Sequence, residues 1–193
     1  MQLFYSNNIK NNTIILDQIE TKHCTKVLRR SIGDIIEVVD GKGNYFKAKI
    51  INFNKIECVA KIVEKKVDFN KRTHYSHIVI SPTKNHERLE WFVEKAVEIG
   101  IDEISLIKCE RTMRKKVRMD RLEKIAKTAM KQTIKASLPK INSIVNFNDF
   151  KIKLNDSNTF ICHLNEEIKN TIFNFRESFD INKSTCIFIG PEG

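Results

Sequence analysis

The sequence predicts an α/β protein with two domains: a small N-terminal β-barrel and a larger C-terminal α/β domain with a parallel sheet. Two observations favour this fold class. Short runs rich in β-branched residues fill the first 70 positions, and strand-like and helix-like patterns alternate from residue 77 onward. The chain has 193 residues, of which 41% are hydrophobic, and this is enough for two cores. We expect domains at residues 1–70 and 74–193, with the polar stretch 65–74 as the linker.

The N-terminal domain is expected to be a barrel, because it holds several strands in few residues. Asp40-Gly41-Lys42-Gly43 is a strong hairpin signal between two of these strands. One short helix is expected at residues 21–30, ending before Gly33. The predicted strands cover residues 13–16, 33–41, 44–51 and 55–63.

The C-terminal domain alternates strands and helices, which is typical of a parallel sheet. The helix expected at 86–100 has an apolar stripe and a terminal glycine, Gly100. A second helix is expected at 120–137, with the apolar stripe Leu122, Ile125, Ala126, Ala129 and Ile134, and is stopped by Pro139. The predicted strands cover residues 77–82, 101–107, 159–164 and 185–190.

Two segments follow directly after predicted strands of this sheet: His163-Leu164-Asn165 and Gly190-Pro191-Glu192-Gly193. Ligands of open α/β sheets bind beyond the carboxyl ends of the strands. The last segment is therefore either part of a ligand site or a plain turn, and the residues alone leave both interpretations open.

The charge is concentrated in one stretch. The net charge is +10, and residues 108–140 hold 12 basic and 3 acidic side chains. This indicates a surface that binds a polyanion such as RNA, and the alternative is a solvated helix with surplus lysines. Five widely spaced cysteines without a Cys-x-x-Cys pair indicate reduced thiols, mostly core fillers, in a cytoplasmic protein and argue against a metal site. No apolar run approaches the ~20 residues of a membrane span.

Six segments, in order along the chain, resemble the bacterial 16S ribosomal RNA (uracil-N3)-methyltransferase family, RsmE, of the knotted SPOUT methyltransferases. They are "HCTKVLRRSIGD" (23–34), "VVDGKGNYFKAKI" (38–50), "WFVEKAVEIGIDEI" (91–104), "ERTMRKK" (110–116), "AMKQTIKASLPKI" (129–141) and "FIGPEG" (188–193). The resemblance implies a PUA-like barrel, a SPOUT domain, S-adenosylmethionine as cofactor, and 16S rRNA in the small ribosomal subunit as substrate. It also implies a homodimer.

The chain departs from the family pattern at three places. Lys135 stands where the family usually has Arg, and Lys131 stands where it usually has Glu. The family also continues beyond the loop at 188–193 with a helix and a Leu-Gly-x-Arg stretch. The resemblance thus implies a trefoil knot and a cofactor pocket that are incomplete in this chain, with weak cofactor binding and no activity.

Methyl transfer to uracil N3 requires loss of the imide proton, so a group that stabilises the anion is needed. Arg111 is the first candidate, and a phosphate contact or a salt bridge with Glu110 is the alternative. Gln132 is the second candidate, and its alternative is plain polar surface. No general base is assigned. The resemblance places the cofactor at His163, Leu164, Gly190, Pro191, Glu192 and Gly193, held mostly by backbone.

The expected RNA contacts lie on both domains. They are Lys26, Arg29, Arg30, Arg114, Lys115, Lys116, Arg118 and Lys135. Trp91 is the only tryptophan, and its place beside an apolar stripe favours a core or interface position over base stacking. Two other functions stay open: a non-catalytic rRNA-binding protein with a PUA-like barrel, and a small-molecule-binding α/β protein with acidic ligands.

Overall fold

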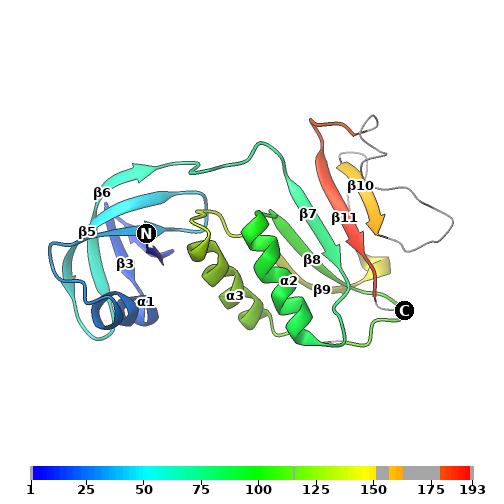
Figure 1. The fold of residues 1–193 in the computed structure, drawn as a ribbon, viewed down its shortest axis with the longest axis horizontal. Helices are drawn as coiled ribbons and strands as arrows, with labels where there is room; N and C mark the ends of the chain where they lie inside the picture. The colour runs from blue at the N-terminus through cyan, green and yellow to red at the C-terminus, as the bar shows by residue number, and fades with distance from the viewer. Residues whose placement is uncertain (1, 115, 151–156, 163–178, 192–193) are drawn as a thin grey trace. The chain divides into compact units, whose positions relative to one another are not determined.

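The computed structural model describes residues 2–114, 116–150, 157–162 and 179–191 of the chain. It divides into two compact units. Unit 1 comprises Met1–Lys71 and Ala126–Leu138, and unit 2 comprises Arg72–Ile125 and Pro139–Gly193. Each unit contains one sheet (Figure 1). The predicted fold class, a β-barrel followed by an α/β domain with a parallel sheet, is confirmed.

Unit 1 is built on a six-stranded sheet in the order β1-β4-β5-β6-β3-β2, antiparallel except for the pair β1–β4. Alternate residues of its strands are buried and form one core that includes Phe4, Ile14, Val38 and Ala60. The elements are β1 (Leu3–Tyr5), β2 (Ile9–Lys10), β3 (Thr13–Leu16), α1 (Gln18–Lys22), a π-helical turn (His23–Val27), β4 (Ile35–Val39), β5 (Tyr45–Phe53) and β6 (Cys58–Lys66).

The predicted hairpin at residues 40–43 joins β4 to β5. Gly41 and Gly43 have φ angles of 73° and 95°, which only glycine adopts readily. The Asp40 carboxylate accepts hydrogen bonds from the backbone N–H groups of Lys42 and Asn44 at 2.8 and 3.1 Å. The hairpin therefore forms where the sequence predicts it, because its glycines and its aspartate both favour a tight turn.

Unit 2 is built on a five-stranded parallel sheet in the order β10-β11-β7-β8-β9. Figure 1 shows helix α2 lying across this sheet, with Leu89, Val93, Ala96 and Val97 buried, as the apolar stripe predicts. The elements are β7 (Ser76–Ile80), α2 (His86–Ile99), β8 (Glu103–Lys108), α3 (Met119–Gln132), β9 (Lys140–Asn146), a 3-10 turn (Phe147–Asp149), β10 (Ser157–Cys162) and β11 (Ser184–Ile189).

The predicted end of one helix is wrong, the predicted core or interface position of Trp91 is narrowed to an interface, and the cysteines agree with the prediction that most of them are core residues. Helix α3 ends at Gln132 and not at residue 137, and Ile134 has a positive φ of 54°. Trp91 is 63% exposed on α2, which rules out a core position. Cys162 is exposed, whereas Cys24, Cys58 and Cys186 are core residues as predicted.

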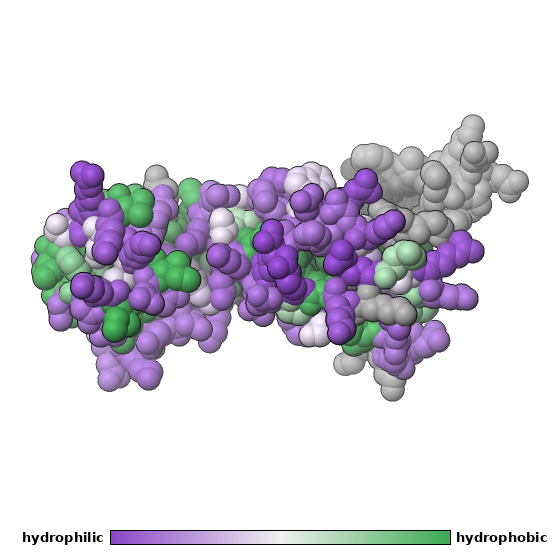
Figure 2. Space-filling model, turned by 90° about the horizontal axis from the view of Figure 1, so that it is seen from below, coloured by the Kyte–Doolittle hydropathy of each residue, from purple (hydrophilic) through white to green (hydrophobic). Residues whose placement is uncertain are grey.

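The described side chains on the face shown in Figure 2 are mostly hydrophilic. On the face shown in Figure 2, hydrophobic atoms form separate patches among hydrophilic side chains. Within the described ranges, no helix is long and apolar enough to cross a membrane. The same residues contain no group of three or more histidine, cysteine or acidic side chains that could hold a metal ion.

Candidate active site and nucleic-acid interface

The carboxyl ends of the strands in unit 2 lie along one edge of the sheet, because all neighbouring pairs are parallel. Figure 1 shows the arrowheads of β7, β10 and β11 pointing the same way. The segments that leave this edge begin at Ser81 after β7, Cys109 after β8, Phe147 after β9 and Gly190 after β11. This is the edge at which parallel α/β sheets bind ligands.

A buried hydrogen bond joins two of these segments. The hydroxyl groups of Ser81 and Thr112 are 2.7 Å apart, and both residues are at least 95% buried. The Thr112 hydroxyl also accepts the Cys109 backbone N–H at 2.8 Å, and the Ser81 backbone N–H donates to the Ile189 carbonyl at 2.9 Å. These bonds connect the ends of β7, β8 and β11. Neither Ser81 nor Thr112 is among the site residues predicted from the sequence, although Thr112 lies in the quoted Glu-Arg-Thr motif.

Arg111 is exposed beside the buried Thr112, three residues after the end of β8. Within the described residues its guanidinium makes no ion pair, so the predicted alternative of a salt bridge with Glu110 is not formed. The buried Thr112 holds the loop through its hydroxyl contacts with Ser81 and Cys109, and no described residue forms an ion pair with the Arg111 side chain. Such a cation can meet an anion that arrives at this edge.

A groove of about 720 Å³ lies at the carboxyl ends of β8 and β9. A volume of this size can take a drug-sized ligand. Two of its polar side chains bind each other, since the Asn146 amide donates to the Asp149 carboxylate at 2.8 Å. It is lined by Lys108, Cys109, Glu110, Thr112 and residues 146–149.

The described part of the predicted cofactor loop is open. A Cβ built on Gly190 would meet no described atom within 4 Å, and the residue has no positive φ. Neither backbone strain nor packing against the described residues therefore requires glycine at this position. Pro191 is partly buried. The other predicted cofactor residues, His163, Leu164, Glu192 and Gly193, lie outside the described residues, as does Lys115.

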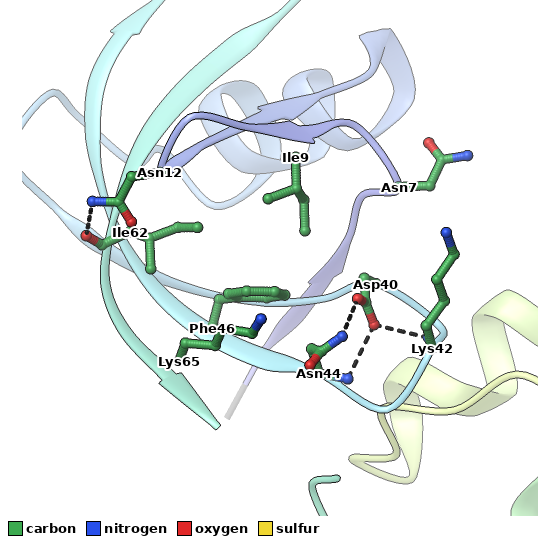
Figure 3. Close-up of a pocket in the computed structure, with 9 residues that line it drawn as sticks. All are labelled: Asn7, Ile9, Asn12, Asp40, Lys42, Asn44, Phe46, Ile62 and Lys65. Atoms are coloured by element: carbon green, nitrogen blue, oxygen red, sulfur yellow. Dashed lines mark hydrogen bonds between the residues drawn. The ribbon is translucent and has the colours of Figure 1, made fainter. Parts of the chain in front are cut away.

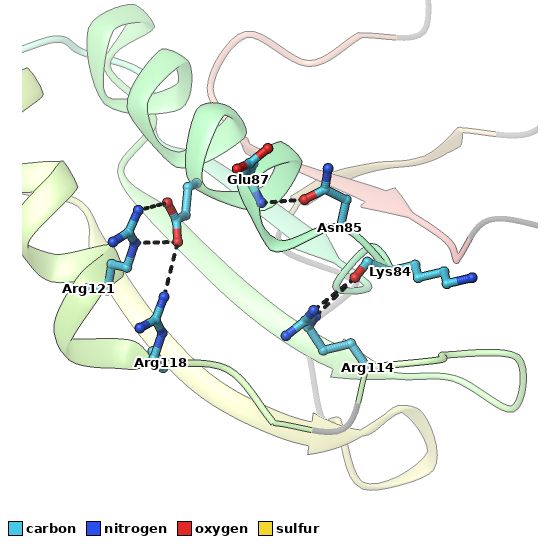
Figure 4. A network of polar contacts seen from close by, with 7 residues as sticks. Lys84, Asn85, Glu87, Arg114, Arg118 and Arg121 are labelled. Carbon is cyan, nitrogen blue, oxygen red and sulfur yellow. Dashed lines mark hydrogen bonds and ion pairs between the residues drawn. The ribbon is translucent and has the colours of Figure 1, made fainter.

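The arginines near the start of α3 bind groups on α2 and on the loop that precedes α2 (Figure 4). Arg121 binds the Glu90 carboxylate with two nitrogens at 2.5 and 2.7 Å, and Arg118 lies 4.0 Å from it. The hydrogen bond from Arg121 lowers the pKa of Glu90. Arg114 donates to the Lys84 carbonyl at 2.9 Å. Arg114 and Arg118 are thus positioned by protein contacts, and Arg118 remains 65% exposed at its side chain.

Gln132 and Lys135 lie in the part of α3 and its following loop that belongs to unit 1. Gln132 is exposed at the last position of α3, and Lys135 is partly buried. Lys131, beside them, forms a salt bridge with the buried Glu20 of α1. Arg111 belongs to unit 2, whereas Gln132 belongs to unit 1. That these two predicted catalytic residues form one site stays a prediction.

The predicted cations of the barrel, Lys26, Arg29 and Arg30, are all exposed. They lie in or just after the π-helical turn, where Arg29 adopts a positive φ of 54°. A separate hollow of about 420 Å³ opens between the hairpin and β2 (Figure 3). Figure 3 shows the Asp40–Asn44 hydrogen bonds on one side of it, and the apolar side chains of Ile9, Phe46 and Ile62 also line it.

Perturbed titratable groups gather at the opposite edge of the sheet. Burial would raise the pKa of Glu103, but hydrogen bonds from Tyr75 at 2.7 Å and Asn142 at 2.6 Å lower it overall. Burial lowers the pKa of His77, which lies 2.8 Å from the Ser105 hydroxyl. Because this network lies at the amino ends of β7, β8 and β9, away from the ligand edge, it is a structural network of the sheet.

Comparisons with known proteins agree with this architecture. A family model described as an RNA methyltransferase domain matches residues 70–193, and one described as an RNA methyltransferase PUA domain matches residues 16–63. The chain is 32% identical over 138 residues to ribosomal RNA small subunit methyltransferase E of Buchnera aphidicola, an alignment covering 66% of this chain and 53% of that protein. The match thus spans about half the length of that relative.

Solved structures show the same fold over the whole chain. A crystal structure of a probable rRNA-methyltransferase from Porphyromonas gingivalis has a TM-score of 0.84 and 31% identity, covering 100% of this chain and 81% of that one. Ribosomal RNA small subunit methyltransferase E from Neisseria gonorrhoeae, bound to S-adenosyl methionine, has a TM-score of 0.83 and 22% identity, covering 100% and 80%. The chain belongs to the RNA methyltransferase family, and its relatives there include proteins named ribosomal RNA small subunit methyltransferase E.

Proposed function

We propose that the function of this protein is methylation of N3 of a uridine in 16S ribosomal RNA, with S-adenosylmethionine as the methyl donor. Membership of the RNA methyltransferase family supports the reaction class, and the Neisseria structure holds this cofactor. The observation that carries the proposal is the exposed guanidinium of Arg111, which has no ion-pair partner among the described residues and lies on a loop fixed by Thr112 at the ligand edge of the parallel sheet.

The end of β11 fits a cofactor that is bound by backbone groups. The space beside Gly190 is free of described atoms within 4 Å, so a ligand can approach its amide and carbonyl closely. We assign cofactor binding to this end of the sheet. The residues concerned are Gly190 and Pro191, together with His163, Leu164, Glu192 and Gly193.

The chemistry of the chain is charge stabilisation and positioning. Bound S-adenosylmethionine supplies an electrophilic methyl group on a sulfonium. The guanidinium of Arg111 would lie beside a uracil carbonyl and stabilise the anion that forms when the imide proton leaves. The amide of Gln132 can both donate and accept, and would hold the uracil edge. Fixing the nucleotide in line with the methyl group supplies a large part of the rate enhancement.

The exposed cations of both units would hold the RNA through its phosphates. The substrate is then 16S rRNA within the small ribosomal subunit, and we further propose a homodimer that acts in the cytoplasm. These contacts are assigned to Lys26, Arg29, Arg30, Arg114, Lys115, Lys116, Arg118 and Lys135.

Methylation of purified small subunits with isotope-labelled S-adenosylmethionine tests the proposal. We expect 3-methyluridine in the digested rRNA, and a loss of about 10²–10³ in kcat for Arg111→Ala. Met113→Ala, on the same loop and 72% exposed, is the matched control and should keep full activity. Binding of rRNA without any methylated nucleoside would favour the non-catalytic RNA-binding protein instead.

A further inference from the structure

Three lysines form one row across the outside of the barrel. The strand registers place Lys49 of β5 opposite Lys61 of β6, Lys61 opposite Thr13 of β3, and Thr13 opposite Lys10 of β2. Residues directly opposite each other on neighbouring strands point to the same face of a sheet. The residues before and after Lys49 and Lys61 in their strands are buried or partly buried on the core side, so the row faces solvent.

The ammonium groups of this lysine row have no acidic partner in the described part of the chain. Among the described residues, no carboxylate forms a salt bridge with Lys10, Lys49 or Lys61. Other lysines of the same unit are paired, because Lys47 and Lys66 both bind Glu64, at 2.9 and 3.3 Å. Like charges directly opposite on neighbouring strands destabilise a sheet. The row therefore costs stability, and no contact of the described structure compensates for it.

The surroundings of the row strengthen its attraction for anions. Ile35 lies opposite Lys49 in the register and is 46% exposed. Ile51 and Val63, two positions further along β5 and β6, are also exposed. Apolar neighbours reduce the water around an ammonium group, and a contact with an anion is stronger where the surroundings are less polar.

We propose that the lysine row of Lys10, Lys49 and Lys61 binds the phosphate backbone of the RNA substrate. Neighbouring strands are ≈ 4.7–4.9 Å apart, so the sheet holds the ammonium groups at regular spacing, which suits a polyanion and carries no base readout. The partner is RNA rather than an acidic protein, because the match to the RNA methyltransferase PUA domain covers Lys49 and Lys61. The inference rests on the proposed function only in its choice of rRNA as the ligand.

The test compares two triple variants with the same change in charge. Lys10→Gln/Lys49→Gln/Lys61→Gln removes the row, and Lys47→Gln/Lys66→Gln/Lys71→Gln removes three lysines that are paired with Glu64 or Asp68. Binding of a 16S rRNA fragment is measured as a function of salt concentration. For the row variant we expect a salt slope reduced by about two to three and a loss of affinity of up to about 100-fold at 0.1 M salt. The control should lose less than about fivefold.

Stability gives an independent readout. Removing the row relieves like-charge repulsion, so the urea midpoint of the row variant should equal or exceed that of the unchanged protein. The urea midpoint of the control variant should not rise. Lower RNA affinity together with unchanged stability supports the proposal. Equal losses of affinity in the two triple variants, or row-dependent binding of poly-glutamate but not of RNA, would overturn it.

The outcome separates this inference from the proposed function. Calorimetry with S-adenosylmethionine should give the same affinity for the row variant and the unchanged protein, because the row lies on unit 1. RNA binding that depends on the row, without any methyl transfer, would support the RNA-binding role of the lysine row and refute the proposed methyltransferase activity. If methyl transfer and RNA binding are both unchanged in the row variant, only the proposed RNA-binding role of the lysine row is refuted.

Discussion

Replacing Thr112 with valine should loosen the candidate active site at its most buried polar contact. Valine keeps the shape of threonine and removes the hydroxyl that accepts the Cys109 N–H at 2.8 Å and meets the Ser81 hydroxyl at 2.7 Å. The buried Ser81 hydroxyl and the partly buried Cys109 N–H then lose a partner, and each loss costs about 1–3 kcal/mol. Because the Ser81 hydroxyl can rotate toward another acceptor, we expect a total loss of about 2–4 kcal/mol of unfolding free energy.

Fluorescence of Trp91 during urea unfolding measures this effect. Trp91 is the only tryptophan, and it lies in unit 2 together with Ser81 and Thr112. Thr133→Val is the matched control: the Thr133 hydroxyl donates to the Ala129 carbonyl at 2.8 Å, and that carbonyl keeps the backbone N–H of Thr133 at 3.0 Å. It should cost less than about 1 kcal/mol, since no group is orphaned.

The double variant Ser81→Ala/Thr112→Val adds a second check. It removes one of the two orphaned groups, so it should be more stable than Thr112→Val alone by about 1 kcal/mol. Methylation should fall in Thr112→Val at urea-free conditions, because Arg111 loses its fixed neighbour. Equal urea midpoints for Thr112→Val and Thr133→Val would refute the assignment of Thr112 as the anchor of this loop.

Three further predictions concern charge, pH and the hairpin. Changing Arg114, Lys115 and Lys116 to Ala should weaken rRNA binding and flatten its salt slope by at most about three, and an unchanged slope would make these residues a solubility feature. The lowered pKa of Glu103 stabilises the fold above the ordinary value of 4.5, and this stability is lost as the pH falls through the lowered pKa. Glu103→Gln should therefore show a smaller loss of unfolding free energy between about pH 5 and about pH 3 than the unchanged protein, and parallel pH profiles would contradict this. Gly41→Ala places a Cβ 2.8 Å from Leu138 Cδ1 at a φ of 73°, and should lower the unfolding free energy by about 1–3 kcal/mol in urea titrations followed by circular dichroism. An unchanged midpoint would show that the hairpin accommodates the added Cβ without strain.

Local sequence patterns predicted the bounds of an element correctly where the residues that start and end it lie within or beside that element. The strand Thr13–Leu16 has the predicted bounds. Helix α2 begins after Asn85, whose side chain accepts the Glu87 N–H, and ends at Gly100 with a φ of 100°. The position of Arg111 at the carboxyl end of a strand also follows from the sequence, because a strand followed by a charged loop is a local pattern.

Patterns failed where partners distant in the sequence decide the structure. Helix α3 ends at Gln132, five residues earlier than predicted, because the next segment bonds to the barrel hairpin. The Leu138 N–H donates to the Gly41 carbonyl and the Gly43 N–H to the Ala136 carbonyl, both at 2.9 Å. Strand β9 was not predicted, since its residues show no alternation and it is a strand through its pairing with β8.

The sequence by itself determined the two-part architecture, the hairpin, the basic stretch and the family resemblance, because each depends on patterns of residues that are neighbours in the chain. Tertiary structure alone decided that Ser81 and Thr112, 31 residues apart, share a hydrogen bond at the ligand edge. It also brought Lys10, Lys49 and Lys61 into one row through strand register. Register and loop contacts depend on which strands become neighbours, and that is settled by the packing of the whole sheet rather than by any local pattern.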